Sequence, residues 1–496
     1  MKYLLGLDIG TSGTKTVLFD ELGNALAEAS ASYPLHQPKN GWAEQAPEDW
    51  WQAVCKTVPV VLKKSGVPSA DIAGIGLSGQ MHGLVMLDAE GRVLRRSIIW
   101  CDGRTAKQCH RMEELVGRDR LIAITGNPAM EGFTTSKILW VRENEPHVYE
   151  KCKHILLPKD YIRYRLCGEH AIDAADASGT QLLDVSARQW SREICSAFGV
   201  DASLLPTVLE GPECSGHLSH HIAAALGLPA GIPIAAGGGD NACAAIGTGV
   251  CRTGKAFTTV GTSGVIVAHT DRVTIDPEAR YHAFCAAIPG GWHMLATTQA
   301  AGGSLSWFRN QIASELSYKE LDALCEQLPI GAENLLYFPY LMGERQPVLG
   351  IKARGVFFGL SAIHQKHHMA RAVMEGVGYS LLDLLEVYRA EGTPCNDMVL
   401  CGGGAKSPFW SQMFADIYGI DIHLGQSGES ACLGAAILGG CAAGIYASVE
   451  EGCHKTVRMR HTVKADAARH LQYRHFYDVY RLLYPKFKAS FEALNP

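Results

Sequence analysis

The sequence contains no run of 18 consecutive apolar residues, so no segment has the length and character of a membrane-spanning helix. Its most apolar stretch, residues 222–239, is interrupted by glycine and proline. The apolar start of the chain is interrupted by Asp8, which is not typical of a secretory signal peptide. These absences predict a protein that neither crosses nor binds a membrane.

The 16 cysteines include no C-x-x-C pair, and we expect no secretory signal peptide before them. In a long chain of this kind, cysteines are usually reduced core residues, so we expect a cytoplasmic protein. An excess of one charge is also missing, since 45 Lys and Arg face 50 Asp and Glu, a net charge of −5. This near balance gives no electrostatic reason to expect a nucleic acid partner, and the expected partners are small molecules.

What the sequence does contain is enough chain for two domains, because 496 residues are too many for one compact core. The first 80 residues predict three meandering strands, a helix over 47–64 and a further buried strand over 72–79. This order is typical of the start of a ribonuclease-H-like domain. The sequence GIGLSG at 74–79 matches a dinucleotide fingerprint, but a strand and a turn follow it instead of the required helix.

The second half of the chain repeats the theme. Residues 255–270 predict a strand, a glycine-rich turn and a strand, and residues 398–419 predict a strand, a glycine loop and a helix. A glycine-rich segment at 245–255 is where we expect the first domain to end. The sequence therefore predicts an α/β protein of two ribonuclease-H-like domains, 1–247 and 248–496.

The tetrapeptide Gly-Thr-Ser-Gly occurs twice, at 10–13 and 261–264, each time directly after a strand-like stretch. Such a turn exposes consecutive backbone N–H groups and two hydroxyls, which suits a phosphate group. Asp8 precedes the first copy and offers a hard carboxylate for Mg²⁺, while Lys15 adds a cation. A plain tight hairpin is the alternative for either copy alone. Two copies, with a third glycine loop at 401–407, favour a nucleotide clamp with one part in each domain.

A further glycine-rich segment, PIAAGGGDNACAAIG at 233–247, ends a buried strand with three glycines before Asp240 begins a helix. An ordinary acidic cap of that helix is one interpretation. The three glycines are more than a cap requires, since they let a ligand and the backbone approach closely. The segment therefore marks Asp240 as a candidate functional carboxylate.

On these residues the chain resembles the FGGY carbohydrate kinases from end to end. That resemblance implies two actin-like ATPase domains with a central cleft, and the transfer of a phosphoryl group from ATP with Mg²⁺. Within the family, the chain is similar to the branch that phosphorylates D-xylulose, while the glycerol branch carries an Arg-Glu pair where Met81 and His82 stand. The segments that carry the resemblance are GFTTSKILWVREN (132–144), GVFFGLSAIHQKHHMARAVMEG (355–376), SGQMHG (78–83), WCDGR (100–104), LLPKDYIRYRLCG (156–168), DAADASGT (173–180) and YLMGERQP (340–347).

Carried over by matching position, the resemblance implies that Asp240 is the catalytic base and that Asp8 lies on the metal side. The candidate sugar-binding residues are Gln80, Met81, His82, Trp100, Asp102 and Asn241. The candidate nucleotide-binding residues are Thr11, Ser12, Lys15, Gly261, Thr262, Ser263, Gly302, Gly303, Gly403, Gly404 and Ala405. Ser407 and Pro408 depart from the amides of glycerol kinase, which puts side-chain contacts to adenine in question.

The chemistry agrees with these roles, because phosphoryl transfer needs positioning, charge neutralisation and a carboxylate that accepts the hydroxyl proton. An aspartate of ordinary pKa, near ~4, is ionised at pH 7 and suits that task. Two other functions stay open: a sister kinase of ribulose, gluconate or another open-chain polyol, and an actin-like ATPase without a sugar substrate. A homodimer is one assembly that the sequence leaves open.

Overall fold

The computed structural model describes residues 1–345, 350–426 and 428–494. The chain forms two compact units, each made of several segments. The first comprises Met1–Cys251, Asp271–His293 and Glu429–Val457, and the second comprises Arg252–Thr270, Met294–Gly428 and Arg458–Pro496. The first break between them falls inside the glycine-rich segment at 245–255. Gln346 and Pro347, the last residues of the motif YLMGERQP, lie outside the described residues.

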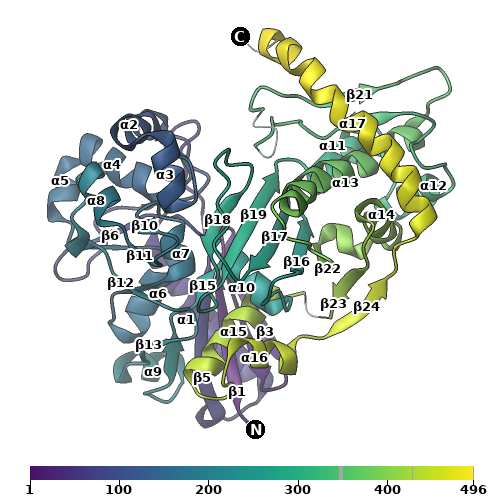
Figure 1. Ribbon diagram of the computed structural model, residues 1–496. Coiled ribbons are helices and arrows are strands. Elements are labelled where there is room, and N and C mark those ends of the chain that lie inside the picture. Colours follow the sequence, from purple (N-terminus) through teal and green to yellow (C-terminus); the bar gives the residue numbers. More distant parts are fainter. Residues whose placement is uncertain (346–349, 427, 495–496) are drawn as a thin grey trace. The chain divides into compact units, whose positions relative to one another are not determined.

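The first unit is built on a mixed sheet with the strand order β13-β14-β5-β1-β2-β3, and β15 also pairs with β5 (Figure 1). β1 is antiparallel to β2 and parallel to β5. The predicted opening of three strands, a helix and a strand is confirmed. The strands of this unit are β1 (Tyr3–Ile9), β2 (Gly13–Asp20), β3 (Ala25–Ser32), β4 (Glu44–Gln45), β5 (Ile72–Gly79), β6 (Val85–Leu87), β7 (Ser97–Ile98), β8 (His154–Leu156), β9 (Ala171–Asp173), β10 (Leu183–Asp184), β11 (Gln189–Trp190), β12 (Thr207–Leu209), β13 (Cys214–His217), β14 (Pro233–Ala235), β15 (Gly238–Gly239) and β18 (His282–Cys285).

The first helix shows why the helices begin and end where they do. It starts with Pro47 and two acidic residues, carries two lysines in its last turn, and stops at Gly66, whose φ is +66°. The helices of the first unit are α1 (Pro47–Ser65), α2 (Ala106–Val116), α3 (Arg118–Thr125), α4 (Thr134–Asn144), α5 (Pro146–Lys151), α6 (Pro158–Cys167), α7 (Ala174–Ser178), α8 (Arg192–Phe198), α9 (His220–Leu226), α10 (Asp240–Gly247), α15 (Ser430–Ala442) and α16 (Val449–Thr456), with short 3₁₀ turns η1 (Ser69–Asp71) and η2 (Ala202–Leu204).

Helix α15 comes late in the sequence but packs in the first unit, against β1, β5 and α10 (Figure 1). Glycines make this contact possible. A Cβ atom at Gly76 of β5 would lie 1.7 Å from the Ala435 carbonyl oxygen, and one at Gly434 would lie 1.9 Å from that of Cys243 in α10. The helix that begins with Asp240 is therefore held from behind by a segment from the C-terminal half of the chain, a return that the sequence does not reveal. The domain boundary at 247/248 stays a prediction.

The second unit repeats the hairpin-and-crossover arrangement. Its sheet has the order β19-β17-β16-β22-β23-β24, in which β16 is antiparallel to β17 and parallel to β22. β16 and β22 thus correspond to β1 and β5 of the first unit. Its elements are β16 (Lys255–Val260), β17 (Gly264–Thr270), β19 (Trp292–Thr298), β20 (Leu336–Phe338), β21 (Val356–Phe358), β22 (Asp397–Gly402), β23 (Ile422–Gly425), β24 (Met459–Val463), α11 (Gly302–Gln311), α12 (Tyr318–Glu326), α13 (Lys366–Ala390), α14 (Pro408–Tyr418), α17 (Ala467–Leu494) and the 3₁₀ turn η3 (Gly403–Lys406).

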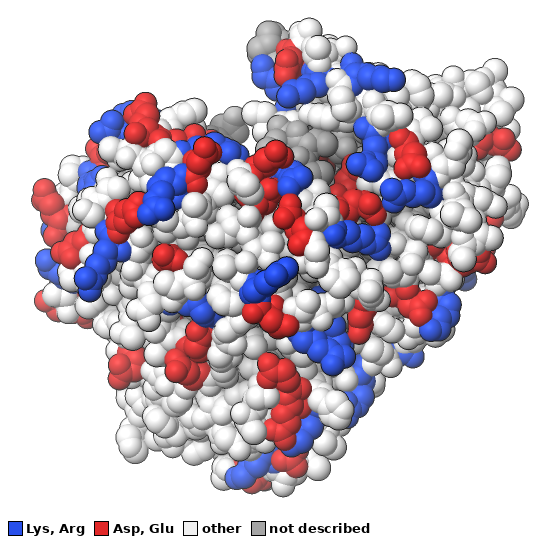
Figure 2. Space-filling view, in the orientation of Figure 1, with Lys and Arg blue, Asp and Glu red and all other residues white. Residues whose placement is uncertain are grey.

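Acidic and basic side chains are intermingled on the face of the molecule seen in Figure 2, as the near balance of the two charges would lead one to expect. No helix in the described ranges is long and apolar enough to span a bilayer. No disulfide joins any of the 16 cysteines, all of which lie in the described part of the chain.

Candidate active site

The turn between β1 and β2 carries the first Gly-Thr-Ser-Gly segment. Tyr33 Oη donates a hydrogen bond to the Gly10 carbonyl, and Gln45 Nε2 donates to the Thr11 carbonyl over 2.7 Å. Trp100 Nε1 donates to Thr11 Oγ1 over 2.8 Å. Three distant segments therefore hold the turn in place, so the neighbouring exposed Ser12 and its N–H groups are preorganised for an anion.

Asp8 lies just before this turn. Ser78 Oγ, near the end of β5, donates to Asp8 Oδ1 over 2.8 Å. Burial raises the pKa of Asp8, while the hydrogen bond from Ser78 and the charge of Lys15 oppose that rise. Lys15 forms an ion pair with Glu429, with 2.7 Å between nitrogen and oxygen. The sequence reasoning missed this acidic partner. A bound phosphate group would have to share Lys15 with Glu429.

Asp240 begins α10 directly after β15. Because β15 pairs in parallel with β5, opposite Ser78 and Gly79, Asp240 lies at the same sheet edge as Asp8. Asp240 Oδ1 accepts hydrogen bonds from the Asn241 N–H over 2.7 Å and from Asn241 Nδ2 over 3.0 Å. The parallel strands therefore bring together two carboxylates that are more than 200 residues apart in the sequence.

The expectation of an ordinary pKa for Asp240 is wrong. Burial, and then the negative charge of Asp8, raise the pKa of Asp240 to about 7, although Asn241 opposes the rise. A cation bound beside Asp8 would offset its charge and lower the pKa of Asp240 again. The ionisation of Asp240 is therefore sensitive to what occupies the site.

The glycines before Asp240 have a packing reason. A Cβ atom at Gly239 would lie 2.8 Å from both Asp176 Oδ1 and Met81 Cγ. Gly237 adopts a φ of +86°, and a Cβ there would lie 2.3 Å from the Leu77 carbonyl oxygen. The strand end that leads to Asp240 can thus approach Met81 only because it lacks side chains.

His82 is held in a conformation that few residues other than glycine adopt, with a φ of +66°. Its Nδ1 lies 2.8 Å from the Gly179 carbonyl oxygen, and its ring stacks on Phe133 with 4.2 Å between centroids. Its own carbonyl accepts hydrogen bonds from Thr134 Oγ1 over 3.1 Å and from Lys137 Nζ over 2.8 Å. These contacts over-determine the position of His82, as is typical of residues that bind a ligand.

Lys137 is a functional candidate that the sequence reasoning did not single out, although it lies in the GFTTSKILWVREN segment. Burial lowers its pKa to about 7, and the negative charge of Asp102 opposes this. Asp102 itself is buried. Its Oδ1 accepts a hydrogen bond from Arg104 Nε over 2.9 Å, and its Oδ2 accepts one from Nε over 3.0 Å and one from Nη2 over 2.7 Å. A sugar hydroxyl would share these oxygens with Arg104.

The two other predicted sugar-side residues differ in exposure. Trp100 is 44% exposed, whereas Gln80 is buried and its Nε2 donates to Gln45 over 2.8 Å.

In the second unit, the second Gly-Thr-Ser-Gly turn joins β16 to β17. The Thr262 carbonyl accepts hydrogen bonds from the Ala301 N–H over 2.9 Å and from the Gly303 N–H over 3.0 Å. A Cβ atom at Gly302 would lie 2.5 Å from the Gly261 carbonyl oxygen. The turn, which includes Ser263, therefore lies against the N-terminal end of α11.

The third glycine loop reaches the same place in this unit. Val260 and Gly402 are paired at the ends of parallel strands β16 and β22. A Cβ atom at Gly404 would lie 2.8 Å from the Val260 side chain, and Gly403 and Ala405 belong to the short turn η3 that follows. All three predicted nucleotide segments of the second unit are thus brought together at one edge of its sheet.

Comparisons with known proteins agree with this arrangement. The model of the FGGY family of carbohydrate kinases, N-terminal domain, matches residues 3–247, and that of the C-terminal domain matches residues 256–443. The chain belongs to the FGGY family of carbohydrate kinases, which share the actin-like ATPase fold.

Among its relatives, the xylulose kinase of Bacillus subtilis (strain 168) is 40% identical over 495 residues, which cover 100% of this chain and 99% of that protein. The crystal structure of a xylulose kinase from Brucella ovis matches with a TM-score of 0.92 at 36% identity, covering 98% of this chain and 99% of the other. The crystal structure of gluconate kinase from Lactobacillus acidophilus matches with a TM-score of 0.94 at 27% identity, over the full length of both chains.

Proposed function

We propose that this chain phosphorylates D-xylulose to D-xylulose 5-phosphate with ATP, a step of xylose catabolism. The observation that carries the proposal is that Met81 packs against Gly239, the residue before Asp240, in a chain that is 40% identical, end to end, to a xylulose kinase. Asp240 is then the general base, accepting the proton of the attacking hydroxyl as the new O–P bond forms and the bond to ADP breaks.

The sugar contacts come from residues around Asp240. His82, with its fixed ring, and Asn241, beside the base, present hydrogen-bonding groups to an open-chain sugar. Met81 supplies an apolar surface next to Gly239. The remaining proposed sugar-binding residues are Gln80, Trp100 and Asp102. Each of these side chains also forms a hydrogen bond within the protein.

Each unit offers its own phosphate-binding features. In the first unit these are Thr11, Ser12 and Lys15, and in the second they are Gly261, Thr262, Ser263, Gly302, Gly303, Gly403, Gly404 and Ala405. Asp8 fits a magnesium ion, because its half-buried carboxylate is a hard oxygen donor that burial makes costly to keep ionised without a cation. When bound, Mg²⁺ would neutralise charge on the ATP phosphates.

The cytoplasm is the proposed compartment, since a chain with 16 cysteines and no disulfide among them suits a reducing environment.

A homodimer is the proposed assembly. Analytical ultracentrifugation tests it, and a single monomeric species at micromolar concentration would contradict it.

A sister activity on gluconate is the second candidate. The gluconate kinase of Lactobacillus acidophilus supports it, because its fold matches this one over the full length of both chains. Fold similarity therefore does not select the sugar, and the residues that contact the hydroxyls must do so.

A substrate panel tests the proposal. ADP release is measured with D-xylulose, D- and L-ribulose, D-gluconate and glycerol at equal concentrations, with Mg²⁺ and ATP. We expect kcat/KM for D-xylulose to exceed that for every other compound by at least about tenfold, as a site that hydrogen-bonds hydroxyls discriminates strongly. A higher kcat/KM for gluconate or ribulose would replace D-xylulose, and ADP release independent of any sugar would refute a sugar kinase.

A further inference from the structure

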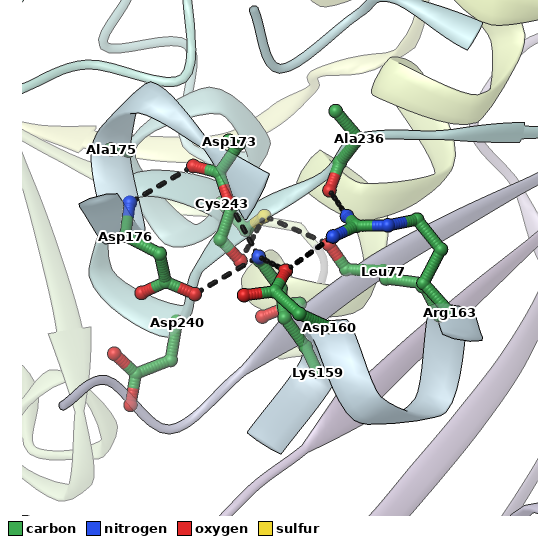
Figure 3. A network of polar contacts seen from close by, with 12 residues as sticks. Leu77, Lys159, Asp160, Arg163, Asp173, Ala175, Asp176, Ala236, Asp240 and Cys243 are labelled. Carbon is green, nitrogen blue, oxygen red and sulfur yellow. Dashed lines mark hydrogen bonds and ion pairs between the residues drawn. The ribbon is translucent and has the colours of Figure 1, made fainter. Parts of the chain in front are cut away.

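A cluster of buried charged side chains lies beside Asp240 (Figure 3). Lys159 Nζ lies 2.5 Å from Asp160 Oδ1, 2.5 Å from Asp173 Oδ2 and 3.0 Å from Asp176 Oδ2. Arg163 pairs with Asp160 over 2.8 Å. All five side chains have an exposed fraction of 0%. Charge that is buried so completely must have a function or be closely balanced.

Lys159 is the cation at the centre of the cluster. The three carboxylates could hold a metal ion by their spacing alone, but the Lys159 ammonium already occupies the place between them. Two cations, Lys159 and Arg163, face three carboxylates. If every group were ionised, one negative charge would remain in a fully buried site, whereas one bound proton makes the cluster neutral.

Asp176 is the carboxylate on which that proton fits. Among the residues that the structure describes, neither of its oxygens accepts a hydrogen bond, whereas Asp160 Oδ1 and Asp173 Oδ1 each accept at least one. Its Oδ2 is the most distant of the three oxygens from Lys159. Burial, with the negative charges of Asp173 and Asp160, raises the pKa of Asp176 well above its usual range, although Lys159 opposes the rise.

The unpartnered oxygen of Asp176 faces the proposed reaction site. An ideal Cβ position at Gly239 lies 2.8 Å from Asp176 Oδ1 and 2.8 Å from Met81 Cγ, so the carboxyl group fills the space behind the residue that precedes Asp240. Figure 3 shows Asp176 on the side of the cluster nearest to Asp240. An ionised Asp176 here would add a negative charge near a base that already feels Asp8.

We propose that Asp176 is a positioning residue for Asp240 and Met81, and that it works in its neutral, protonated form, anchored by Lys159. The inference rests on the proposed function for its catalytic readout. The neutral carboxyl supports the strand end β15 and the side chain of Met81 without opposing the ionisation of the base.

Two variants of Asp176 separate shape from charge. Asp176→Asn keeps the shape and the proposed neutral state, so we expect kcat and the KM for the sugar within about threefold of wild type. Asp176→Ala leaves Gly239 and Met81 unsupported, so we expect kcat/KM for the sugar to fall about 10- to 100-fold with an unchanged KM for ATP. As a control, Ser178→Ala removes another buried group of the same helix. It should lower the melting temperature without a selective fall in kcat/KM for the sugar.

Two results would overturn the proposal. One is an Asn variant as impaired as the Ala variant, which would mean that Asp176 acts as an anion. The other is an Ala variant that keeps kcat/KM within threefold of wild type, which would mean that Asp176 positions nothing.

An infrared measurement keeps the proposal testable if Asp176→Ala does not fold, or if the sugar is not D-xylulose. At neutral pH, the difference spectrum of wild type against Asp176→Asn should show the carbonyl stretch of one protonated carboxyl group. The absence of that band would refute a neutral Asp176 whatever the substrate. A wild-type protein that shows the band but phosphorylates no sugar would refute the proposed function alone.

Discussion

The raised pKa of Asp240 makes the pH dependence of the reaction a sharp prediction. A general base acts only when ionised, and the pKa of Asp240 in the ligand-free protein is about 7. At pH 6 roughly a tenth of such groups are ionised, against about 99% for an aspartate with an ordinary pKa near ~4. Because kcat/KM measured with both substrates far below their KM values reports the free enzyme, it should fall about fivefold between pH 7 and pH 6 under those conditions.

The profile of kcat should differ from that of kcat/KM. Since a bound cation offsets the charge of Asp8, the acid limb of kcat should lie at lower pH than the acid limb of kcat/KM. The assay separates ADP from ATP by chromatography at fixed times between pH 5 and 9, which avoids coupling enzymes with their own pH dependence. Circular dichroism at each pH confirms that the protein stays folded. A kcat/KM that is constant from pH 6 to 8 would refute the reasoning.

Further predictions concern packing and the two ligands. Gly76→Ala should destabilise the protein by about 3 kcal/mol or more, because its Cβ would lie 1.7 Å from the backbone oxygen of Ala435, whereas Gly428→Ala, which meets open space, should leave the melting temperature unchanged. His82→Ala should raise the KM for the sugar roughly tenfold without changing the KM for ATP, and a rise in the ATP constant alone would place His82 in the nucleotide site. Gly302→Ala, whose Cβ would lie 2.5 Å from the Gly261 carbonyl oxygen, should raise the KM for ATP without changing the KM for the sugar. An unchanged KM for ATP would remove that loop from the nucleotide site.

The sequence was sufficient for the order of strands and helix at the start of the chain and for locating the turns and glycine loops that carry many of the candidate residues, because such segments leave local patterns. The two Gly-Thr-Ser-Gly turns do join antiparallel strands, as predicted. The raised pKa of Asp240 could not be predicted, because it depends on burial and on the charge of Asp8, which only parallel strand pairing brings close.

Other features depend on contacts that leave no local pattern. Tyr33, just after β3, and Gln45, in β4, hold the first turn from segments whose sequences contain nothing unusual. Lys159 and Asp176 lie in segments that the resemblance had marked, but their ion pair joins two elements with no common motif. The return of α15 to the first unit escaped notice for the same reason, since only the glycines that permit close packing record it.

The direct test of the central claim is the turnover of D-xylulose by Asp240→Asn. The substitution removes the proton acceptor and keeps a side chain of the same size at the start of α10. We predict a loss of kcat of about 10²- to 10⁴-fold, with ATP binding and the melting temperature retained. A variant that keeps more than about a tenth of wild-type turnover would contradict the assignment of Asp240 as the general base.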